Sequence, residues 1–579
     1  MAISVYFNNK KITLPGAYAT VAAGEQNDPR ALDYGKCLII DTGKFGEGWC
    51  GGKGITTDNG DNTTEDNGTN AVYRFDNIDD FRSFVKGGMY WQLANALFFP
   101  DATNAAAVGV SEIMFVRAAK TKPATMTFKP AGQTDQEKET SKPGSNGGTI
   151  VITTKDEGYI ANGTKGDDKF DDKGTYQKGN AASSLDDLKK GYGFRTRTGD
   201  VDSSKLIFEI YRGTFTGLYN DGISYNEVSL ADSKPELVIA SPEFGNISDL
   251  AEWMRNSSAF NNLFELESAS PKGTGAVTNN DASGNNAITP AKDGSDDYTG
   301  TDQLNNVLKA ITNLDNSFVF ADDNTEAISK KILSHITQDA KFKKLLFVAG
   351  KDDQYGFSES IEEAQALNSP YACYVHGGVG MASTATGIGY RWWGSYYNMC
   401  SILARTAGKA PQIPVTNKTI GVSKLQHQLN DTDKKRALDA GLLVTIYNES
   451  LQKFVVLQGI NTMQGLNNQV LFTNNGESFS IQFMRVVMQI NKELVVNSEI
   501  DLLSAENGVN SNTLSAGILK NWTENYLLTR TATATSDNLL LSYRNVTVTK
   551  KDDYYLVTYG IVINNEINKI FFTGFVFKN

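Results

Sequence analysis

In two separate stretches of the chain, residues 31–119 and 304–415, segments with the hydrophobic pattern of a helix alternate with segments with the pattern of a strand. The segment DNIDDFRSFVKGG has apolar residues at helical spacing, with Asn77 as a capping residue and Gly87 as a stop. The segment KKLLFVAG is short and apolar, which is typical of a buried strand. Such alternation predicts one α/β middle domain, with at least partly parallel strands, built from both stretches.

The intervening residues 120–303 predict a β-rich domain inserted into the middle domain. Residues 120–200 are rich in Gly, Lys, Thr and Asp, and strand-like and helical segments such as KLIFEIYRG and NISDLAEWMRNS follow them. We therefore expect an outer surface domain with its own small mixed core. Because residues 131–200 contain few core-forming side chains, we also expect that much of this stretch can be deleted without loss of soluble protein.

The last part of the chain, residues 416–579, predicts an α+β domain. It contains a capped helix (NDTDKKRALDAG), a strand pair (LLVTIYN and KFVVLQG) and a long helix (SFSIQFMRVVMQINKELVV). YYLVTYGIVI, the turn NNE and INKIFFTGFVF predict a terminal hairpin, so an arm spans about residues 554–579. The overall expectation is a multidomain α/β and α+β protein with extended terminal strands.

The two ends of the chain carry strands that cannot form a core by themselves. Residues 1–30 contain two short apolar stretches around a Pro-Gly turn, and the C-terminal strand is apolar on both faces. A two-sided apolar strand at an open edge recruits other chains, so it must lie between neighbouring strands. It either closes a sheet of its own chain or completes a sheet of a neighbouring subunit. The candidate residues of the two arms are Val5, Phe7, Pro15, Gly16, Tyr18, Ile570, Phe571, Phe572, Phe575, Val576 and Phe577.

Few residue patterns point to catalysis or ligand binding. The three histidines have no ligand-spaced partner, which argues against a zinc or non-haem iron site. The loop GKFGEGWCGGKG lacks the spacing of a phosphate-binding loop, and VHGGVG is not accompanied by a G-x-S-x-G nucleophile elbow. We therefore expect no catalytic residue, cofactor or metal, and interpret His376 as a histidine at the end of a strand.

Charge and hydrophobicity exclude further classes of protein. The formal net charge of −11 argues against a general nucleic-acid binder. No apolar run approaches the ~20 residues that a membrane span needs, and MAISVYFNNK has no apolar core of a signal peptide. The four cysteines form no C-x-x-C pair and are expected to be reduced thiols.

Several segments, taken in order, resemble the contractile tail sheath proteins of contractile-tailed phages and related injection machines. They are the P-G-x-Y element at Pro15, Gly16 and Tyr18, the segment from SFVKGG through LANALFFPDATNAAAVGVSEIMFVRA, KKLLFVAG, NSPYACYVHG, LARTAGKAPQIPVTNKTIGV, and the G-x-x-T element at Gly459 to Thr462. The resemblance covers about residues 10–120 and 304–579, without the insertion. The chain departs from the family pattern in its prolines, which are displaced to Pro411 and Pro414.

The resemblance implies a structural protein and no enzyme. Subunits would stack as six-membered rings around a tail tube, and their arms would exchange strands, with the C-terminal domain facing inward. Contraction of this sheath would drive the tube through the host envelope. The implied partners are further copies of the chain, the tail tube protein, and baseplate and tail terminator proteins, with no direct contact to nucleic acid and no membrane insertion. The implied location is the tail of a virion assembled in the cytoplasm of a bacterial host.

Two other interpretations remain open. One is another virion structural protein, such as a capsid or baseplate component, which would assemble into shells or single rings. The other is a polysaccharide hydrolase that uses two of the many carboxylates of residues 120–303.

Overall fold

The computed structural model divides the chain into two compact units, one of residues 33–488 with 565–579 and one of residues 1–32 with 489–564. It describes residues 5–7, 10–12, 33–45, 50–54, 72–85, 88–128, 150–165, 169–170, 176–177, 179–213, 217–220, 225–228, 234–266, 287–298, 301–383, 389–465, 472–473, 476–503, 514–531, 539–551 and 554–564. Residues 53–70, whose Asp, Asn, Thr and Gly content predicts a long surface loop, lie almost entirely outside the described residues.

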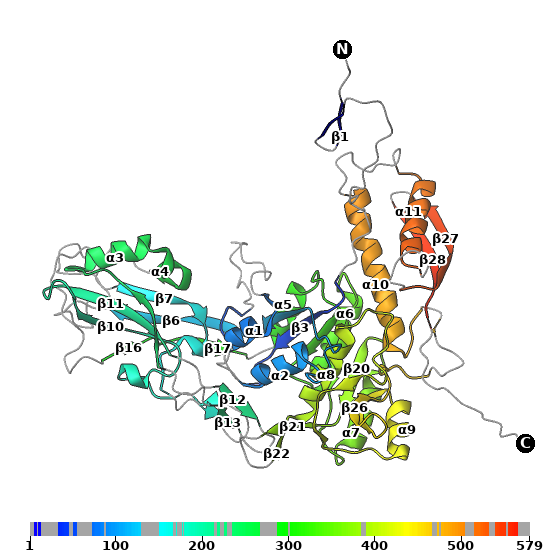
Figure 1. Ribbon diagram of the computed structural model, residues 1–579, viewed down its shortest axis with the longest axis horizontal. Coiled ribbons are helices and arrows are strands. Elements are labelled where there is room, and N and C mark those ends of the chain that lie inside the picture. Colours follow the sequence, from blue (N-terminus) through cyan, green and yellow to red (C-terminus); the bar gives the residue numbers. More distant parts are fainter. Residues whose placement is uncertain are drawn as a thin grey trace, which may run out of the picture. The chain divides into compact units, whose positions relative to one another are not determined.

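A mixed sheet of nine strands forms the centre of the larger unit, in the order β23-β26-β25-β20-β19-β18-β3-β5-β4 (Figure 1). Its strands are β3 (Lys36–Asp41), β4 (Tyr73–Phe75), β5 (Glu112–Arg117), β18 (Phe318–Ala321), β19 (Leu345–Ala349), β20 (Ala372–His376), β23 (Thr419–Ile420), β25 (Leu442–Asn448) and β26 (Lys453–Val456). The six strands from β25 to β5 are parallel to their neighbours, and β4, β26 and β23 pair antiparallel. Strands β19 and β20 are buried throughout, and β19 confirms the buried strand predicted for KKLLFVAG.

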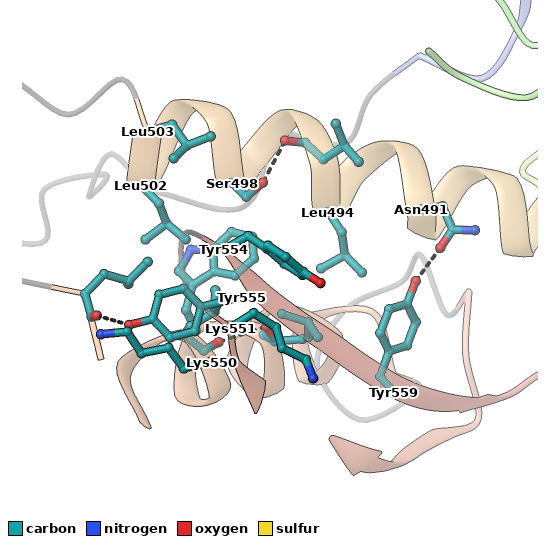
Figure 2. Close-up of a pocket in the computed structure, with 16 residues that line it drawn as sticks. Asn491, Leu494, Ser498, Leu502, Leu503, Lys550, Lys551, Tyr554, Tyr555 and Tyr559 are labelled. Atoms are coloured by element: carbon teal, nitrogen blue, oxygen red, sulfur yellow. Dashed lines mark hydrogen bonds between the residues drawn. The ribbon is translucent and has the colours of Figure 1, made fainter. Parts of the chain in front are cut away.

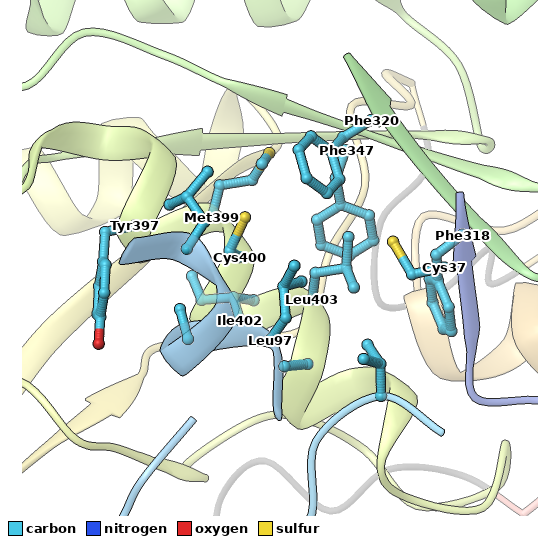
Figure 3. Close-up of a cluster of buried hydrophobic side chains, with 14 of the residues drawn as sticks. Cys37, Leu97, Phe318, Phe320, Phe347, Tyr397, Met399, Cys400, Ile402 and Leu403 are labelled. Atoms are coloured by element: carbon cyan, nitrogen blue, oxygen red, sulfur yellow. The ribbon is translucent and has the colours of Figure 1, made fainter. Parts of the chain in front are cut away.

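Helices cover both faces of this sheet. They are α1 (Ile78–Val85), α2 (Gly88–Phe98), α5 (Thr301–Ala310), α6 (Glu326–Gln338), α7 (Phe357–Leu367), α8 (Gly394–Ala407) and α9 (Asp431–Asp439). Alternate residues of a strand point to opposite faces, so Cys37 and Ile39 of β3 pack with α1, α2 and α8, whereas Leu38 and Ile40 pack with α5, α6, α7 and α9. Figure 3 shows Cys37 in the same cluster as Leu97 of α2 and Leu403 of α8. The Asn77 side chain accepts a hydrogen bond of 2.9 Å from the Asp80 backbone N–H, as predicted for a capping residue.

The insertion contains two four-stranded sheets around its own core. One sheet has the order β15-β7-β6-β17 and the other β14-β11-β10-β16. Their strands are β6 (Lys120–Phe128), β7 (Ile150–Glu157), β10 (Tyr192–Thr198), β11 (Leu206–Arg212), β14 (Glu236–Ala240), β15 (Phe264–Leu266), β16 (Thr289–Pro290) and β17 (Ser295–Asp297), accompanied by α3 (Ile247–Asn256) and α4 (Ser258–Leu263). Apolar side chains from both sheets and both helices form one buried cluster.

The expectation that much of residues 131–200 is dispensable is wrong. This stretch supplies β7 and β10, and Ile152 and Phe194 on these strands are buried in the core of the insertion. The prediction failed because these strands have apolar residues only at the positions that face the core, while polar residues dominate the stretch as a whole.

Several shorter elements complete the larger unit. They are β8 (Lys169–Phe170), β9 (Tyr176–Gln177), β12 (Gly217–Asn220), β13 (Tyr225–Val228), β21 (Val379–Ser383), β22 (Gly389–Trp392), β24 (Lys424–Leu425), and single 3₁₀ turns at Tyr159–Ala161 and Leu185–Asp187. Strands β22, β21 and β24 form a small sheet, and β8–β9 and β12–β13 form hairpins.

The smaller unit consists of two hairpins and helical segments. Its elements are β1 (Val5–Phe7), β2 (Lys10–Ile12), the end of α10 (Ile481–Ser498), a π-helical turn (Glu499–Leu503), α11 (Ala516–Thr529), β27 (Ser542–Lys550) and β28 (Tyr555–Val562). Strand β28 pairs antiparallel with β27. The terminal hairpin had been predicted between β28 and INKIFFTGFVF, but that second segment lies outside the described residues.

The boundary predicted after residue 415 does not coincide with the division in the structure. Strands β23, β25 and β26 follow this residue but belong to the nine-stranded sheet. The reason is the apolar start of β25, which is buried and pairs in parallel with β20. The compact units divide later, between Met488 and Gln489 inside α10.

Candidate functional site

The carboxyl edge of the parallel strands is the place where open α/β sheets usually bind ligands. In this chain β3 ends in Asp41 and β5 ends in Arg117, and both side chains are buried. The insertion adds Asp296 and Tyr298 to the same edge. Arg117 Nη2 lies 2.8 Å from Asp296 Oδ1, and the Tyr298 hydroxyl donates a hydrogen bond of 2.7 Å to Asp41 Oδ2. Side chains of the chain itself thus occupy this edge.

Asp322, which follows β18, binds the start of the glycine-rich loop. Its Oδ1 accepts hydrogen bonds of 2.7 Å from the backbone N–H and the hydroxyl of Thr42. Its Oδ2 accepts from the backbone N–H groups of Lys44 and Phe45, at 2.6 and 3.2 Å. The backbone N–H groups of Thr42, Lys44 and Phe45 are therefore bound to a carboxylate of the same chain.

The charges at this edge lie in a medium of low polarity. Burial raises the pKa of Asp41, although Arg117 and Tyr298 oppose the shift. Burial and the neighbouring Asp41 carboxylate raise the pKa of Asp322 to about 8. For Arg117, burial lowers the pKa, but Tyr298 and the carboxylates raise it more, so that it lies well above its usual value. Arg117 forms ion pairs with both Asp41 and Asp296, at 3.7 and 2.8 Å, and is therefore the cationic centre of the cluster.

Two histidines that are 51 positions apart in the chain lie side by side. His376 Nε2 lies 3.0 Å from His427 Nδ1, and His376 Nδ1 lies 2.9 Å from the Ser360 hydroxyl. His376 is the last residue of β20, as predicted, but its pairing with His427 was not predicted. Burial, and then repulsion from His427, lower the pKa of His376 to about 4. The Ser360 hydroxyl is buried, so this arrangement holds a neutral imidazole in the core and does not expose a nucleophile.

The smaller unit contains an apolar cavity of about 700 Å³ between α10, α11 and the β27–β28 hairpin (Figure 2). Leu494 and Leu502 from the helical side face the aromatic rings of Tyr554 and Tyr555 at the end of the hairpin. Three hydrogen bonds frame it, from the Tyr559 hydroxyl to Asn491, from the Tyr555 hydroxyl to the Leu514 carbonyl oxygen, and from the Ser498 hydroxyl to the Val495 carbonyl oxygen. Further lining residues are Leu503, Leu519, Trp522, Thr523, Lys550, Lys551 and Val557.

A buried charge cluster holds α10 and α11 together next to this cavity. The Glu493 carboxylate accepts a hydrogen bond from the Tyr526 hydroxyl and lies 2.9 Å from Arg530 Nε. Both charged side chains are buried. Removal of either one would leave an uncompensated charge, so the pair fixes the packing of the two helices.

The terminal strands are the sites that the sequence predicted for contacts between subunits. Val5 and Phe7 lie on β1, which pairs with β2. Pro15, Gly16, Tyr18 and the six C-terminal candidates from Ile570 to Phe577 lie outside the described residues. Strands β27 and β28 each pair only with the other among the described strands. One backbone edge of each strand is thus without a described partner.

Few features of the sequence indicate the buried clusters. Asp41 and Arg117 each follow a run of four apolar residues and end a strand. This pattern indicates a polar site at the carboxyl edge of the sheet. Asp296 and Tyr298 stand in the acidic stretch DGSDDY, which is indistinguishable from a solvated loop. Within the described part of the chain, no group of three or more His, Cys, Asp or Glu side chains could hold a metal ion. The described helices include none that is long and apolar enough to cross a membrane.

No model of a protein family matches the chain, and no curated protein sequence matches it. Solved structures do resemble it. A sheath tail protein of Desulfitobacterium hafniense is 13% identical, with a TM-score of 0.51 over 94% of this chain and 100% of that protein. A sheath tail protein of Listeria innocua is 11% identical, with a TM-score of 0.52 over 92% of this chain and 96% of that protein. The resemblance predicted from the sequence is thus confirmed at the level of the fold: this chain has the fold of sheath tail proteins.

Proposed function

We propose that this chain is the subunit of a contractile sheath that surrounds a tail tube. The observation that carries the proposal is the fold shared with two sheath tail proteins over more than nine tenths of the chain. A fold alone does not determine function, so the composition of the sites supports the second step. The edge of the sheet where an enzyme would bind substrate is occupied by the chain's own Arg117, Asp296 and Tyr298.

The terminal arms are proposed to connect neighbouring subunits. A strand added to the edge of β27 or β28 would form main-chain hydrogen bonds with a backbone that has no other described strand partner. The predicted strand from Phe571 to Phe577 has apolar side chains on both faces. It suits insertion into a sheet of another subunit, because both faces would then be covered by protein. Such links would keep the lattice continuous while the subunits change their packing.

Contraction needs no catalytic residue in this proposal. The extended lattice would be a metastable assembly, and repacking of whole subunits would release free energy stored during assembly. The domain at the end of the chain would face the tube, and the insertion would face outward, where additions are tolerated. The other proposed partners are the tail tube protein, the baseplate and the tail terminator, in a virion tail assembled in the bacterial cytoplasm.

Electron microscopy of the purified, concentrated chain tests this proposal. Long hollow tubes of uniform width are expected, since a sheath subunit carries the contacts of its own lattice. Closed shells or single rings would instead favour a capsid or baseplate component and would overturn the proposal.

A further inference from the structure

A cluster of positive charge without ion-pair partners lies at the end of α8. Arg405 is only 3% exposed; its Nη1 donates a hydrogen bond of 3.3 Å to the Ala106 carbonyl oxygen, and its Nε has no hydrogen-bond acceptor. Burial lowers the pKa of the nearby Lys409, and the charges of Arg405 and Lys418 lower it further. Among the described residues, none of these three side chains forms an ion pair. Asp101 opposes the charge of the buried Arg405, so the positive charge of this part of the surface comes from the partly exposed Lys409 and Lys418.

Exposed apolar side chains surround this cluster. Phe99 is 55% exposed and Val108 is 57% exposed in the segment between α2 and β5, and Ile413 is 37% exposed after α8. The two segments are in close contact, since a Cβ on Gly408 would lie 1.9 Å from the Val108 carbonyl oxygen. We name Phe99, Val108, Arg405, Lys409, Ile413 and Lys418 the basic patch. Its mixture of apolar and cationic groups is typical of an interface with an acidic partner.

The same chain presents an acidic surface around an exposed tyrosine. The segment of residues 350–363, which we name the acidic loop, comprises the loop after β19 and the first two turns of α7, and Tyr355 in it is 85% exposed. The loop contains five carboxylates, Asp352, Asp353, Glu359, Glu362 and Glu363, and one cation, Lys351. Lys351 pairs with Glu359 and Glu363 at 2.9 and 3.4 Å, which leaves a large negative excess.

The acidic loop lies at the carboxyl end of the parallel strands of the nine-stranded sheet, and the basic patch lies near their amino end. The acidic loop directly follows the carboxyl end of β19. Helix α8 begins beside this loop, because the Ser395 hydroxyl donates a hydrogen bond of 2.5 Å to the Gly350 carbonyl oxygen. It then runs for 14 residues, about 21 Å at 1.5 Å per residue, and ends against Val108 and Gly109, which precede β5. The two surfaces are therefore too far apart to meet within one chain.

We propose that the acidic loop of one copy docks on the basic patch of the next copy. Complementary surfaces at opposite ends of the strands produce a head-to-tail contact between copies. Such contacts build an open helical assembly when the rotation from one copy to the next does not close a ring. Tyr355 would cover the exposed apolar groups, and the carboxylates would neutralise Lys409 and Lys418. The inference rests on the proposed self-assembly and assigns it a contact that is independent of the terminal arms.

Charge reversal in the full-length chain tests the contact. One variant carries Lys409→Glu and Lys418→Glu, which makes the basic patch net negative, and the other carries Gln354→Lys, Glu359→Lys and Glu362→Lys, which makes the acidic loop net positive. Each alone should raise the concentration needed for sedimentable assemblies by roughly tenfold or more, because surfaces of like net charge would face each other. An equimolar mixture should restore assembly, since one interface is then native in sign and the next is reversed on both sides. The matched control, Lys122→Glu with Lys189→Glu on exposed positions of the insertion, should behave like the unmodified chain.

A cross-link measures the same contact without reference to the shape of the assembly. The four native cysteines are buried, so a Tyr355→Cys copy and an Ile413→Cys copy mixed with a bismaleimide should yield a covalent dimer. The inference is overturned if the dimer is absent, if both charge variants assemble like the unmodified chain, or if their mixture does not recover. A different result would overturn the proposed sheath function. In that case the cross-linked dimer forms, but the assemblies are shells or single rings and not tubes.

Discussion

Arg117 and Asp296 form a buried ion pair of 2.8 Å that joins the last residue of β5 to β17 of the insertion. Neither side chain is exposed to solvent. The pair lies where the insertion meets the carboxyl edge of the central sheet, together with Asp41 and Tyr298. It therefore ties the insertion to the middle domain, and the two are expected to move as one body when subunits repack.

The first prediction concerns this pair. Arg117→Met should reduce the free energy of unfolding by about 3–5 kcal/mol, because it leaves buried carboxylates without a cation. Chemical denaturation followed by fluorescence measures the loss. Arg74→Met is the matched control: it removes the half-exposed 2.8 Å pair with Glu112 and should cost less than about 1 kcal/mol. Equal effects of the two substitutions would contradict the role given to Arg117.

The second prediction is a dependence of stability on pH. The folded-state pKa of His376 is about 4, below the ordinary value of 6.5, so the folded protein favours the neutral imidazole. Its contribution to stability is fully present above about pH 6.5 and is lost as the pH falls toward 4. The loss amounts to about 1.4 kcal/mol per pH unit. His376→Gln should remove this contribution, so the difference in stability between the unmodified protein and the variant should change by about 1.4 kcal/mol per pH unit between pH 6.5 and 4. Parallel stability curves would refute the assignment.

The third prediction corrects the expectation that residues 131–200 are dispensable. Phe194 of β10 is stacked on Phe208 of β11, with ring centroids 5.0 Å apart. Phe194→Ala should therefore lower the stability of the insertion by about 3–5 kcal/mol. Val201→Ala, at an exposed position in the same region, should change it by less than about 0.5 kcal/mol. Limited proteolysis of the insertion distinguishes the two, and equal resistance of both variants would show that β10 is not part of its core.

The fourth prediction concerns the C-terminal arm. Deletion of residues 567–579 should abolish ordered assembly and leave the monomer folded, because the two-sided apolar strand is proposed to pair with another subunit. Circular dichroism reports the fold, and negative-stain microscopy reports assembly. Removal of Lys578 and Asn579 alone is the control and should leave assembly unchanged. Regular tubes from the longer truncation would exclude the arm as a required connection.

Much of the fold could be predicted from the sequence because it depends on local patterns. The buried strands β19 and β20 and the capped helix α1 follow from apolar runs and a capping residue. The paired strands β25 and β26 were also predicted, but their place in the central sheet was not. Which strands pair over long distances depends on packing that no local pattern contains.

The polar clusters could not be predicted for the same reason. Arg117 and Asp296 are 179 positions apart, and His376 and His427 are 51 apart with no ligand spacing. Only the placement of Asp41 and Arg117 at the ends of apolar strands indicated a polar edge. The contact between the basic patch and the acidic loop likewise depends on the distance across the sheet, which follows from the fold.

Cryo-electron microscopy of assemblies of the purified chain would show directly whether the chain forms a sheath. We expect a hollow helical tube of stacked six-membered rings, in which the density of each terminal arm continues into a sheet of a neighbouring subunit. A closed shell, a single ring, or arms that fold back onto their own subunit in every copy would contradict it.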